Sequence, residues 1–312
     1  MKQDICVFVI SLKNSTRFPL LQKRLGKLKI KFKVIEGING LEYYKKKKIN
    51  KISNSKKILN NVGRNMSPQE IGAAASHLKI YSYIVKNNIQ QAIILEDDAY
   101  PSKKMFDWIK HKIEIDNNQI LGFYAYPSGI IIKKAKKKVL KNINIHESKT
   151  HLFNNSCYQI NNFTAKKILK ITGGRVIGFA DWPFNMTKDK IKFLITIPFM
   201  TLINDRGISY LKKSRYEILG KTKFLTIKNM IRGSFLKFTI FLYYILFIPF
   251  IFKKYKNLDY YIEHFFLKNF YAFINIFSNT YYEQTKLFHN QKFYCKDLAK
   301  EQVKQDIRFH EI

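Results

Sequence analysis

The chain has 312 residues, 46% of them hydrophobic, which excludes a disordered chain and suffices for one large domain or one domain with an appended module. Its 56 Lys and Arg against 22 Asp and Glu give a formal charge of +34, which favours nucleic acid, a membrane surface or a phosphorylated substrate as partner. Only eight of the basic residues are Arg, and the chain is also rich in Ile, Asn, Phe and Tyr, so we assign about half of the excess charge to biased composition.

The cysteines and the N-terminus predict a reducing compartment and no cleaved export signal. Cys6, Cys157 and Cys295 are odd in number and far apart, so they offer neither a disulfide framework nor a metal-binding quartet. The apolar run at residues 5–12 has little charge before it and no small-x-small cleavage site after it, so we interpret it as a first strand. The expected compartment is the cytoplasm or the cytoplasmic face of a membrane.

The first sixty residues predict a β-α-β unit followed by a mobile loop. After the strand at residues 5–12, leucines at helical spacing over residues 20–28 predict a helix, and residues 32–35 form a second strand. Arg17 lies in the polar turn at the carboxyl end of the first strand. It is a candidate for contact with a nucleotide phosphate or base, and equally for a solvated turn cation. The lysine- and asparagine-rich residues 43–61 are predicted to be the loop.

A long helix with a clear N-terminal signal is predicted next. Ser67 as N-cap and Glu70 three residues later form a capping box, and the helix should run to about residue 85. Small residues at positions 72–76 remove bulk from its first turns, which lets a sheet or a ligand approach closely. Glu70 is fully explained as the capping partner. A lone histidine such as His77 is more often a structural residue than a ligand.

The consecutive acids Glu96, Asp97 and Asp98 are the candidate functional site. They follow residues 92–95, an apolar run typical of a buried strand in a parallel sheet. Neighbouring carboxylates are unfavourable unless a cation, N–H donors or water compensates them, and a divalent metal is the simplest compensation. Ligands of open α/β sheets bind beyond the carboxyl ends of the strands, so a metal here would be within reach of a nucleotide diphosphate.

Further α/β elements are predicted up to about residue 209. We expect helices from Ser102 to 113 and over 165–171, strands at 121–126, 129–132, 151–160 and 192–197, and a solvated lysine-rich loop at 133–138. Asp181 lies in a segment of aromatic residues and proline, which suggests a partly desolvated carboxylate at a fixed turn. Such a group is suited to act as a base, although a structural cap explains the pattern equally well.

Residues 219–312 are predicted to form a separate basic, aromatic-rich helical region after a catalytic domain at residues 1–218. The nineteen residues 234–252 carry one charge, Lys237, which nearly permits a membrane span. Basic residues flank both ends and oppose a defined orientation, so we favour a helix that lies in the membrane interface. The aromatic residues beyond it either dip into lipid or form an ordinary core.

Several short motifs occur in a fixed order along residues 5–215. They are Val9-Ile10-Ser11-Leu12 with Arg17, Glu36-Gly37-Ile38-Asn39-Gly40, Glu70-Ile71-Gly72, Ser76-His77-Leu78, Ile93-Ile94-Leu95-Glu96-Asp97-Asp98, Tyr158-Gln159-Ile160 before Ala165-Lys166-Lys167-Ile168-Leu169, and Asp181-Trp182-Pro183-Phe184. As a spaced set they resemble glycosyltransferase family 25, the lipopolysaccharide and lipooligosaccharide glycosyltransferases. Two departures are Ala73, where the family often has Cys, and residues 220–312, which match no part of it.

This resemblance implies an α/β fold of the GT-A type, with a Rossmann-like nucleotide-binding sheet, and an inverting, metal-dependent transfer. The implied donor is UDP-galactose, with UDP-glucose or UDP-N-acetylglucosamine as alternatives, and the implied cofactor is Mn²⁺ or Mg²⁺. It further implies that Asp98 binds the metal with Asp97 or Glu96 assisting, and that Asp181 is the base. The implied donor-binding residues are Arg17, Glu70, Ser76, His77, Glu96 and Asp97. Asn204 and Asp205 are candidates for a third metal ligand.

The leading hypothesis is a galactosyltransferase that extends lipooligosaccharide or another lipid-linked oligosaccharide at the anionic inner face of a bacterial membrane. A nucleic-acid-binding protein would also explain the charge, but no binding module is recognisable and the basic residues are spread rather than striped. A third hypothesis is an inactive relative that acts as an adaptor, whose biological role would survive the substitution Asp98→Ala.

Overall fold

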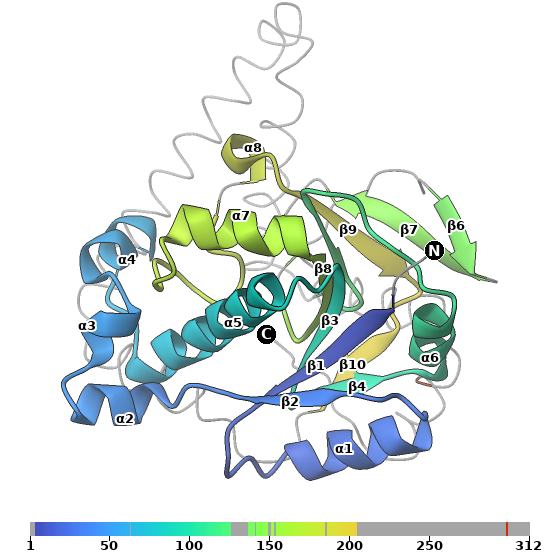
Figure 1. The fold of residues 1–312 in the computed structure, drawn as a ribbon, viewed down its shortest axis with the longest axis horizontal. Helices are drawn as coiled ribbons and strands as arrows, with labels where there is room; N and C mark the ends of the chain where they lie inside the picture. Colours follow the sequence, from blue (N-terminus) through green and yellow to red (C-terminus); the bar gives the residue numbers. More distant parts are fainter. Residues whose placement is uncertain are drawn as a thin grey trace, which may run out of the picture. The chain divides into compact units, whose positions relative to one another are not determined.

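A mixed eight-stranded sheet organises the part of the chain that this computed structural model describes, which is residues 4–62, 64–125, 137–140, 142–148, 151–152, 154–184, 186–204 and 298. The strand order is β2-β1-β3-β8-β5-β9-β7-β6, and β10 pairs with β4 in a second, two-stranded sheet (Figure 1). In the large sheet β7 and β8 run opposite to the other six strands. The strands are β1 (Ile5–Ser11), β2 (Lys33–Glu36), β3 (Gln91–Glu96), β4 (Ala99–Pro101), β5 (Gln119–Gly122), β6 (Lys137–Leu140), β7 (Ile143–Ser148), β8 (Cys157–Asn161), β9 (Lys192–Ile197) and β10 (Thr201–Ile203). The α/β class expected from the sequence is confirmed.

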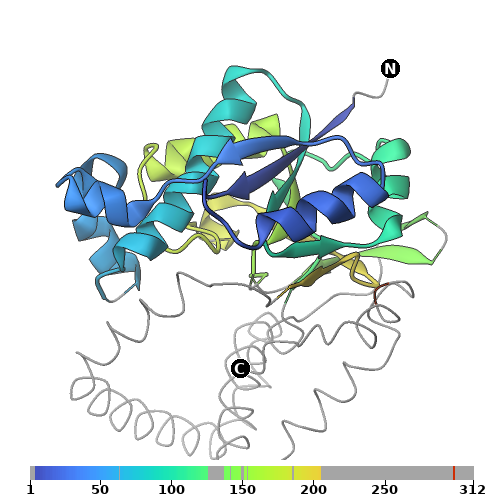
Figure 2. The same ribbon diagram turned by 90° about the horizontal axis from the view of Figure 1, so that it is seen from below.

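Helices cover both faces of this sheet. The chain passes from β1 to β2 in one direction across the sheet and from β2 to β3 in the other, so right-handed crossovers place α1 and α5 on opposite faces. Consecutive side chains of β8 point to opposite faces of the sheet. Tyr158 contacts His77 of α5 on one face, and Gln159 accepts a hydrogen bond from Trp108 of α6 on the other. α7 packs beside α5, away from α1 (Figures 1 and 2). The helices are α1 (Phe18–Lys27), α2 (Gly40–Lys45), α3 (Ile49–Ile52), α4 (Ser55–Val62), α5 (Pro68–Lys86), α6 (Lys103–Lys110), α7 (Asn162–Thr172) and α8 (Met186–Asp189).

The predicted capping box at the start of α5 is confirmed. Ser67 Oγ accepts a hydrogen bond from the Glu70 N–H at 3.1 Å, and the Glu70 carboxylate accepts one from the Ser67 N–H at 2.9 Å. The predicted close approach is confirmed as well. A Cβ on Gly72 would lie 2.5 Å from the nitrogen of Gly40, and a Cβ on Gly40 would overlap the carbonyl oxygen of Pro68. The start of α2 is therefore in backbone contact with α5.

The prediction of a mobile loop at residues 43–61 is wrong, because α2, α3 and α4 occupy most of this stretch. Among the residues of these three helices, all of which the structure describes, Ile58 is the one buried hydrophobic side chain. Ser53 instead forms a β-bridge with Val176, and the Asn54 N–H donates to the Val176 carbonyl at 2.9 Å. These backbone bonds anchor the junction between α3 and α4, and Ile49, Ile52 and Val62 pack, partly buried, against the hydrophobic core.

The later elements agree with the predictions in kind but differ in extent. β9 coincides with the strand predicted at residues 192–197, whereas β8 begins only at Cys157 and α6 ends at Lys110. β6 begins inside the predicted lysine-rich loop, and β4, β7 and β10 were not predicted. β8 is also antiparallel to both of its neighbours, β3 and β5, so the sheet that was expected to be parallel around residues 92–95 is mixed.

Several predictions concern residues outside the described part of the chain. They are the strand at 129–132, the interface helix at 234–252 and the region 219–312 apart from Leu298. The chain divides into two compact units, one of Met1–Leu211 with Asn290–Ile312 and the other of Lys212–His289. Leu298 is buried in the hydrophobic core of the first unit. None of the described helices combines the length and apolar character needed to span a bilayer.

Candidate functional site

The acidic cluster, which we define as Glu96, Asp97 and Asp98, lies where two parallel strands end. β3 ends at Glu96, and its partner β1 is in register with Ile10 opposite Glu96, so β1 ends one residue later. The turn that follows β1 is therefore beside the acidic cluster, although some 80 residues separate them in sequence. This is the edge of an α/β sheet at which ligands collect.

Arg17 bridges two of the three acids. Its Nη2 lies 2.7 Å from Asp97 Oδ1, and its Nη1 lies 2.7 Å from Asp98 Oδ2. Ser15 Oγ donates to the other oxygen of Asp97 at 2.5 Å and accepts from the N–H of Arg17 at 3.2 Å. The exposed fractions of the three side chains are 21% for Arg17, 10% for Asp97 and 15% for Asp98, so the ion pairs are only partly accessible to water.

One guanidinium leaves the acidic cluster short of positive charge. Burial, and after it the charge of Glu96, raise the pKa of Asp98 to about 7 although Arg17 acts in the opposite direction. Burial also raises the pKa of Asp97. In addition, Asp98 Oδ1 is buried and has no hydrogen-bond partner in the described part of the chain.

These features fit a divalent cation held by Asp98 and Asp97. Carboxylate oxygens suit Mg²⁺ and Mn²⁺, which commonly bind one or two carboxylates and complete their shell with substrate phosphates and water. Within the described ranges, no group of three or more His, Cys, Asp or Glu side chains forms a complete metal site. A cation here would therefore depend on the substrate for part of its coordination. Asn204 lies beside Asp98, because its N–H donates to the Asp98 carbonyl at 2.7 Å, and Asp205 lies outside the described residues.

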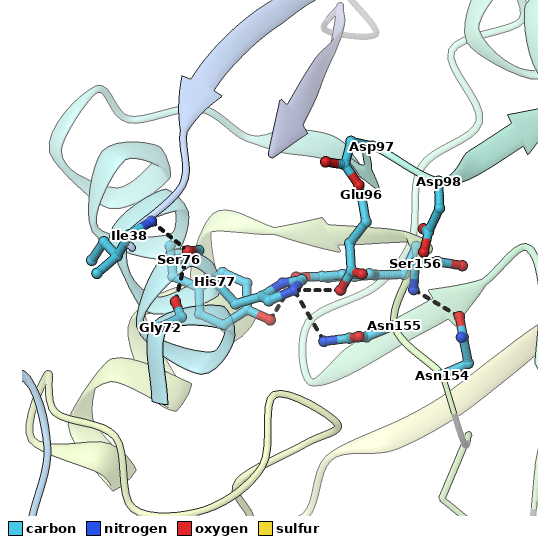
Figure 3. A network of polar contacts seen from close by, with 12 residues as sticks. Ile38, Gly72, Ser76, His77, Glu96, Asp97, Asp98, Asn154, Asn155 and Ser156 are labelled. Atoms are coloured by element: carbon cyan, nitrogen blue, oxygen red, sulfur yellow. Dashed lines mark hydrogen bonds and ion pairs between the residues drawn. The ribbon is translucent and has the colours of Figure 1, made fainter. Parts of the chain in front are cut away.

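Glu96 belongs to a separate hydrogen-bond network that runs into the core. Its Oε1 lies 3.0 Å from His77 Nε2, and His77 Nδ1 lies 2.8 Å from the Tyr158 hydroxyl, which in turn lies 2.7 Å from the Tyr81 hydroxyl. The Asn155 amide nitrogen lies 3.1 Å from the same His77 Nε2. Figure 3 shows Glu96 turned towards His77 and Asn155, whereas Asp97 turns the other way. The sequence missed Tyr81, Tyr158 and Asn155 as site residues, although Tyr158 lies in one of the quoted motifs.

The structure places three of the predicted donor-binding residues inside the fold. Glu70 is 2% exposed and, besides the capping box, pairs with Arg64 at 2.8 Å. Ser76 is 4% exposed, accepts from the Ile38 N–H at 2.8 Å and donates to a carbonyl of its own helix. His77 is 3% exposed. These side chains support the elements around the acidic cluster, and a direct contact of any of them with the donor stays a prediction.

Asp181 lies at a tight turn, as predicted, and is an exposed residue. The Trp182 N–H donates to the Ala180 carbonyl at 2.7 Å, and Trp182 has a left-handed backbone with φ of 63°. Its indole is buried, donates to the Leu152 carbonyl and contacts Tyr158 edge to face at 5.0 Å. Trp182 thus takes the inner side of the turn, which leaves Asp181 on the outer side.

Comparisons with known proteins assign the chain to a protein family. The model of glycosyltransferase family 25 (LPS biosynthesis protein) matches residues 4–178, more than half of the chain, and this range includes the acidic cluster but ends before Asp181. Among solved structures, the chain is similar to a glycosyltransferase involved in the glycosylation of the major capsid of PBCV-1, with 12% identity over 53% of this chain. The TM-score is 0.25, and this chain spans 64% of the length of that structure, so the similarity carries no argument about the site. A comparison with curated protein sequences found no match.

Proposed function

Because the chain belongs to glycosyltransferase family 25 (LPS biosynthesis protein) and is therefore a glycosyltransferase, we propose that it transfers galactose from UDP-galactose to a lipooligosaccharide or other lipid-linked oligosaccharide. The observation that carries this proposal is the pairing of Arg17 with Asp97 and Asp98 at the common carboxyl edge of β1 and β3. UDP-glucose and UDP-N-acetylglucosamine are the alternative donors, since a few side chains of a pocket decide among such sugars.

The chemical demand at this edge is the charge of the leaving diphosphate. Mn²⁺ or Mg²⁺, when bound, would act as a Lewis acid that offsets this charge. Asp98, with Asp97, would hold the cation, and Arg17 would contribute a further positive charge and fork-shaped N–H donors to phosphate oxygens. Glu96, held by His77, would face the donor as a hydrogen-bond acceptor.

The proposed base for the acceptor hydroxyl is Asp181. An inverting transfer needs a carboxylate that takes the proton of the attacking hydroxyl on the face of the sugar opposite to the leaving group. The buried Trp182 and its contact with Tyr158 support this role, because they connect the turn of Asp181 to the network that holds Glu96. Asp181→Asn should then lower kcat while it leaves the binding of the donor unchanged.

The acceptor and the location are proposed from charge. The core of a lipooligosaccharide and the inner leaflet both carry anionic groups, so a chain with a formal charge of +34 would be attracted to the cytoplasmic face of the membrane that presents this acceptor. Vesicles of anionic lipid should retain the protein at low salt and release it at high salt.

The decisive experiment is a panel of UDP-sugars, with and without Mn²⁺, read by thermal unfolding and by hydrolysis of the donor. One UDP-sugar should stabilise the wild type only with the metal, by about 2.7 kcal/mol at a concentration of about 100 Kd. Asp98→Asn should abolish both the stabilisation and the hydrolysis. Asp116→Asn, which removes an exposed acid in the loop before β5, is the matched control and should behave like the wild type. A wild type that responds to no nucleotide sugar would overturn the proposal.

A further inference from the structure

Arg17 and the proposed divalent cation use the same two carboxylates. The guanidinium does not form a fork on one acid but spans two, with one nitrogen 2.7 Å from Asp97 and another 2.7 Å from Asp98. The remaining oxygen of Asp97 is held by Ser15, and the remaining oxygen of Asp98 is the buried Oδ1, which has no hydrogen-bond partner among the described residues. A cation that binds Asp98 through Oδ1 therefore arrives directly beside the positive charge of Arg17.

Two positive charges in such a place repel strongly. Water is partly excluded from these ion pairs and screens the repulsion less than it would at an open surface, and the double charge of a divalent ion doubles it. The backbone of Arg17 is fixed, because its N–H and that of Phe18 donate to Ser15 Oγ at 3.2 and 3.3 Å. The long side chain, which is 21% exposed, is the part that can move.

We propose that Arg17 is an exchangeable internal counter-ion, which neutralises Asp97 and Asp98 in the free enzyme and turns to the diphosphate of the donor when the divalent cation takes its place. The proposal rests on the proposed function. It predicts that the metal alone binds weakly, because it must first displace Arg17. It also predicts that metal and donor bind cooperatively, because the diphosphate gives the displaced guanidinium a new anionic partner and contributes ligands to the metal.

The coupling must be reciprocal. Any free energy by which the nucleotide improves the binding of the metal also appears as improved binding of the nucleotide by the metal. In an enzyme without the guanidinium, nothing competes with the divalent cation for Asp97 and Asp98, and the contact between Arg17 and the diphosphate is absent as well. Arg17 would thus favour the cation that arrives with a nucleotide over the free cation.

The test measures binding of Mn²⁺ alone by electron paramagnetic resonance of the free ion, and binding of UDP with and without Mn²⁺ by calorimetry. Arg17→Met should bind Mn²⁺ alone about fivefold more tightly or better, bind UDP in the presence of Mn²⁺ more weakly, and lose most of the cooperativity. Arg17→Lys keeps a charge that cannot span both acids, so it should change in the same direction by a smaller factor. This second variant decides the matter if Arg17→Met does not fold.

Lys27→Met is the matched control, because it removes an exposed positive charge from α1 away from the site. It should leave unchanged the affinity for Mn²⁺ alone and the affinity for UDP with and without Mn²⁺. This result would distinguish a local competition at Arg17 from the general electrostatic field of a basic protein. If both Arg17 variants bind Mn²⁺ alone no more tightly than the wild type, while the wild type binds Mn²⁺ and UDP together, this inference is wrong and the proposed function stands. If the wild type does not bind Mn²⁺ and UDP together, both fall.

Discussion

His77 shows how a single buried residue holds an acid of the site in place. An ionised carboxylate only accepts hydrogen bonds, so His77 donates from Nε2 to Glu96, and its Nδ1 accepts from the Tyr158 hydroxyl. Tyr158 then accepts from Tyr81. Burial raises the pKa of both tyrosines, which keeps them as neutral hydroxyls. One orientation of hydrogen atoms therefore satisfies the chain from Glu96 to Tyr81, and in it the Asn155 amide nitrogen, 3.1 Å from the same Nε2, makes no hydrogen bond to His77.

Replacement of His77 should cost stability in proportion to the partners lost. His77→Phe leaves the buried Tyr158 hydroxyl without this acceptor, at about 1–3 kcal/mol, and removes the His77 donor from Glu96, whose side chain is 26% exposed and can turn to water. His77→Gln can still bond to one of the two. Urea denaturation measures the difference. His111→Gln, at the exposed end of α6, should stay within about 0.5 kcal/mol of the wild type. A His77→Phe protein as stable as that control would contradict the network.

Asp98 should make the free energy of unfolding depend on pH near neutrality. Its pKa of about 7 in the folded chain lies above the ordinary value of 3.8, so the folded state holds the proton more tightly than the unfolded state does. The resulting stabilisation is present at low pH and is lost as the pH rises through 7, and each unit of the shift corresponds to about 1.4 kcal/mol. Without added metal, the wild type should therefore lose stability relative to Asp98→Asn between about pH 4 and pH 7, and the difference should be constant above that range. Parallel curves for the two proteins would contradict the raised pKa.

At the scale of elements, two glycines in helices, Gly26 and Gly72, distinguish the effect of helix propensity on stability from the effect of close packing. Alanine favours a helix by about 0.8–1.0 kcal/mol over glycine. At Gly26 in α1 a methyl group would meet nothing within 4 Å, so Gly26→Ala should raise the free energy of unfolding by about that amount. Gly72→Ala should lower it, because the methyl group would meet the backbone of Gly40 and Ile38 at 2.5 and 2.6 Å. Thermal unfolding of both variants decides this, and a stabilised Gly72→Ala would show that α2 can move away from α5.

The elements also show what the sequence can and cannot predict. The capping box of α5 was predictable because Ser67 and Glu70 interact within one turn. The helices α2 to α4 were not predictable, because their contacts are with distant segments: α2 meets α5 where Gly40 faces Gly72, and the junction of α3 and α4 bonds to Val176. The acidic cluster was recognisable from the sequence, because acidic residues are rare in this chain and three of them directly follow an apolar strand. The partners of these acids were not, because Arg17 meets them through the pairing of β1 with β3, and His77 does so through the face on which α5 packs.

At the scale of the whole molecule, the position of β8 has a consequence for synthesis. β3 and β5 leave the ribosome before β8. They do not pair with each other in the sheet, because β8 lies between them. Until residue 161 has emerged, the nascent chain therefore carries two open strand edges next to apolar residues, which is the kind of surface that aggregates or recruits chaperones. The acidic cluster, at the end of β3, gains its support from Tyr158 only at that moment. A pause in synthesis after β5 has emerged and before β8 has emerged would prolong the exposure of both strand edges.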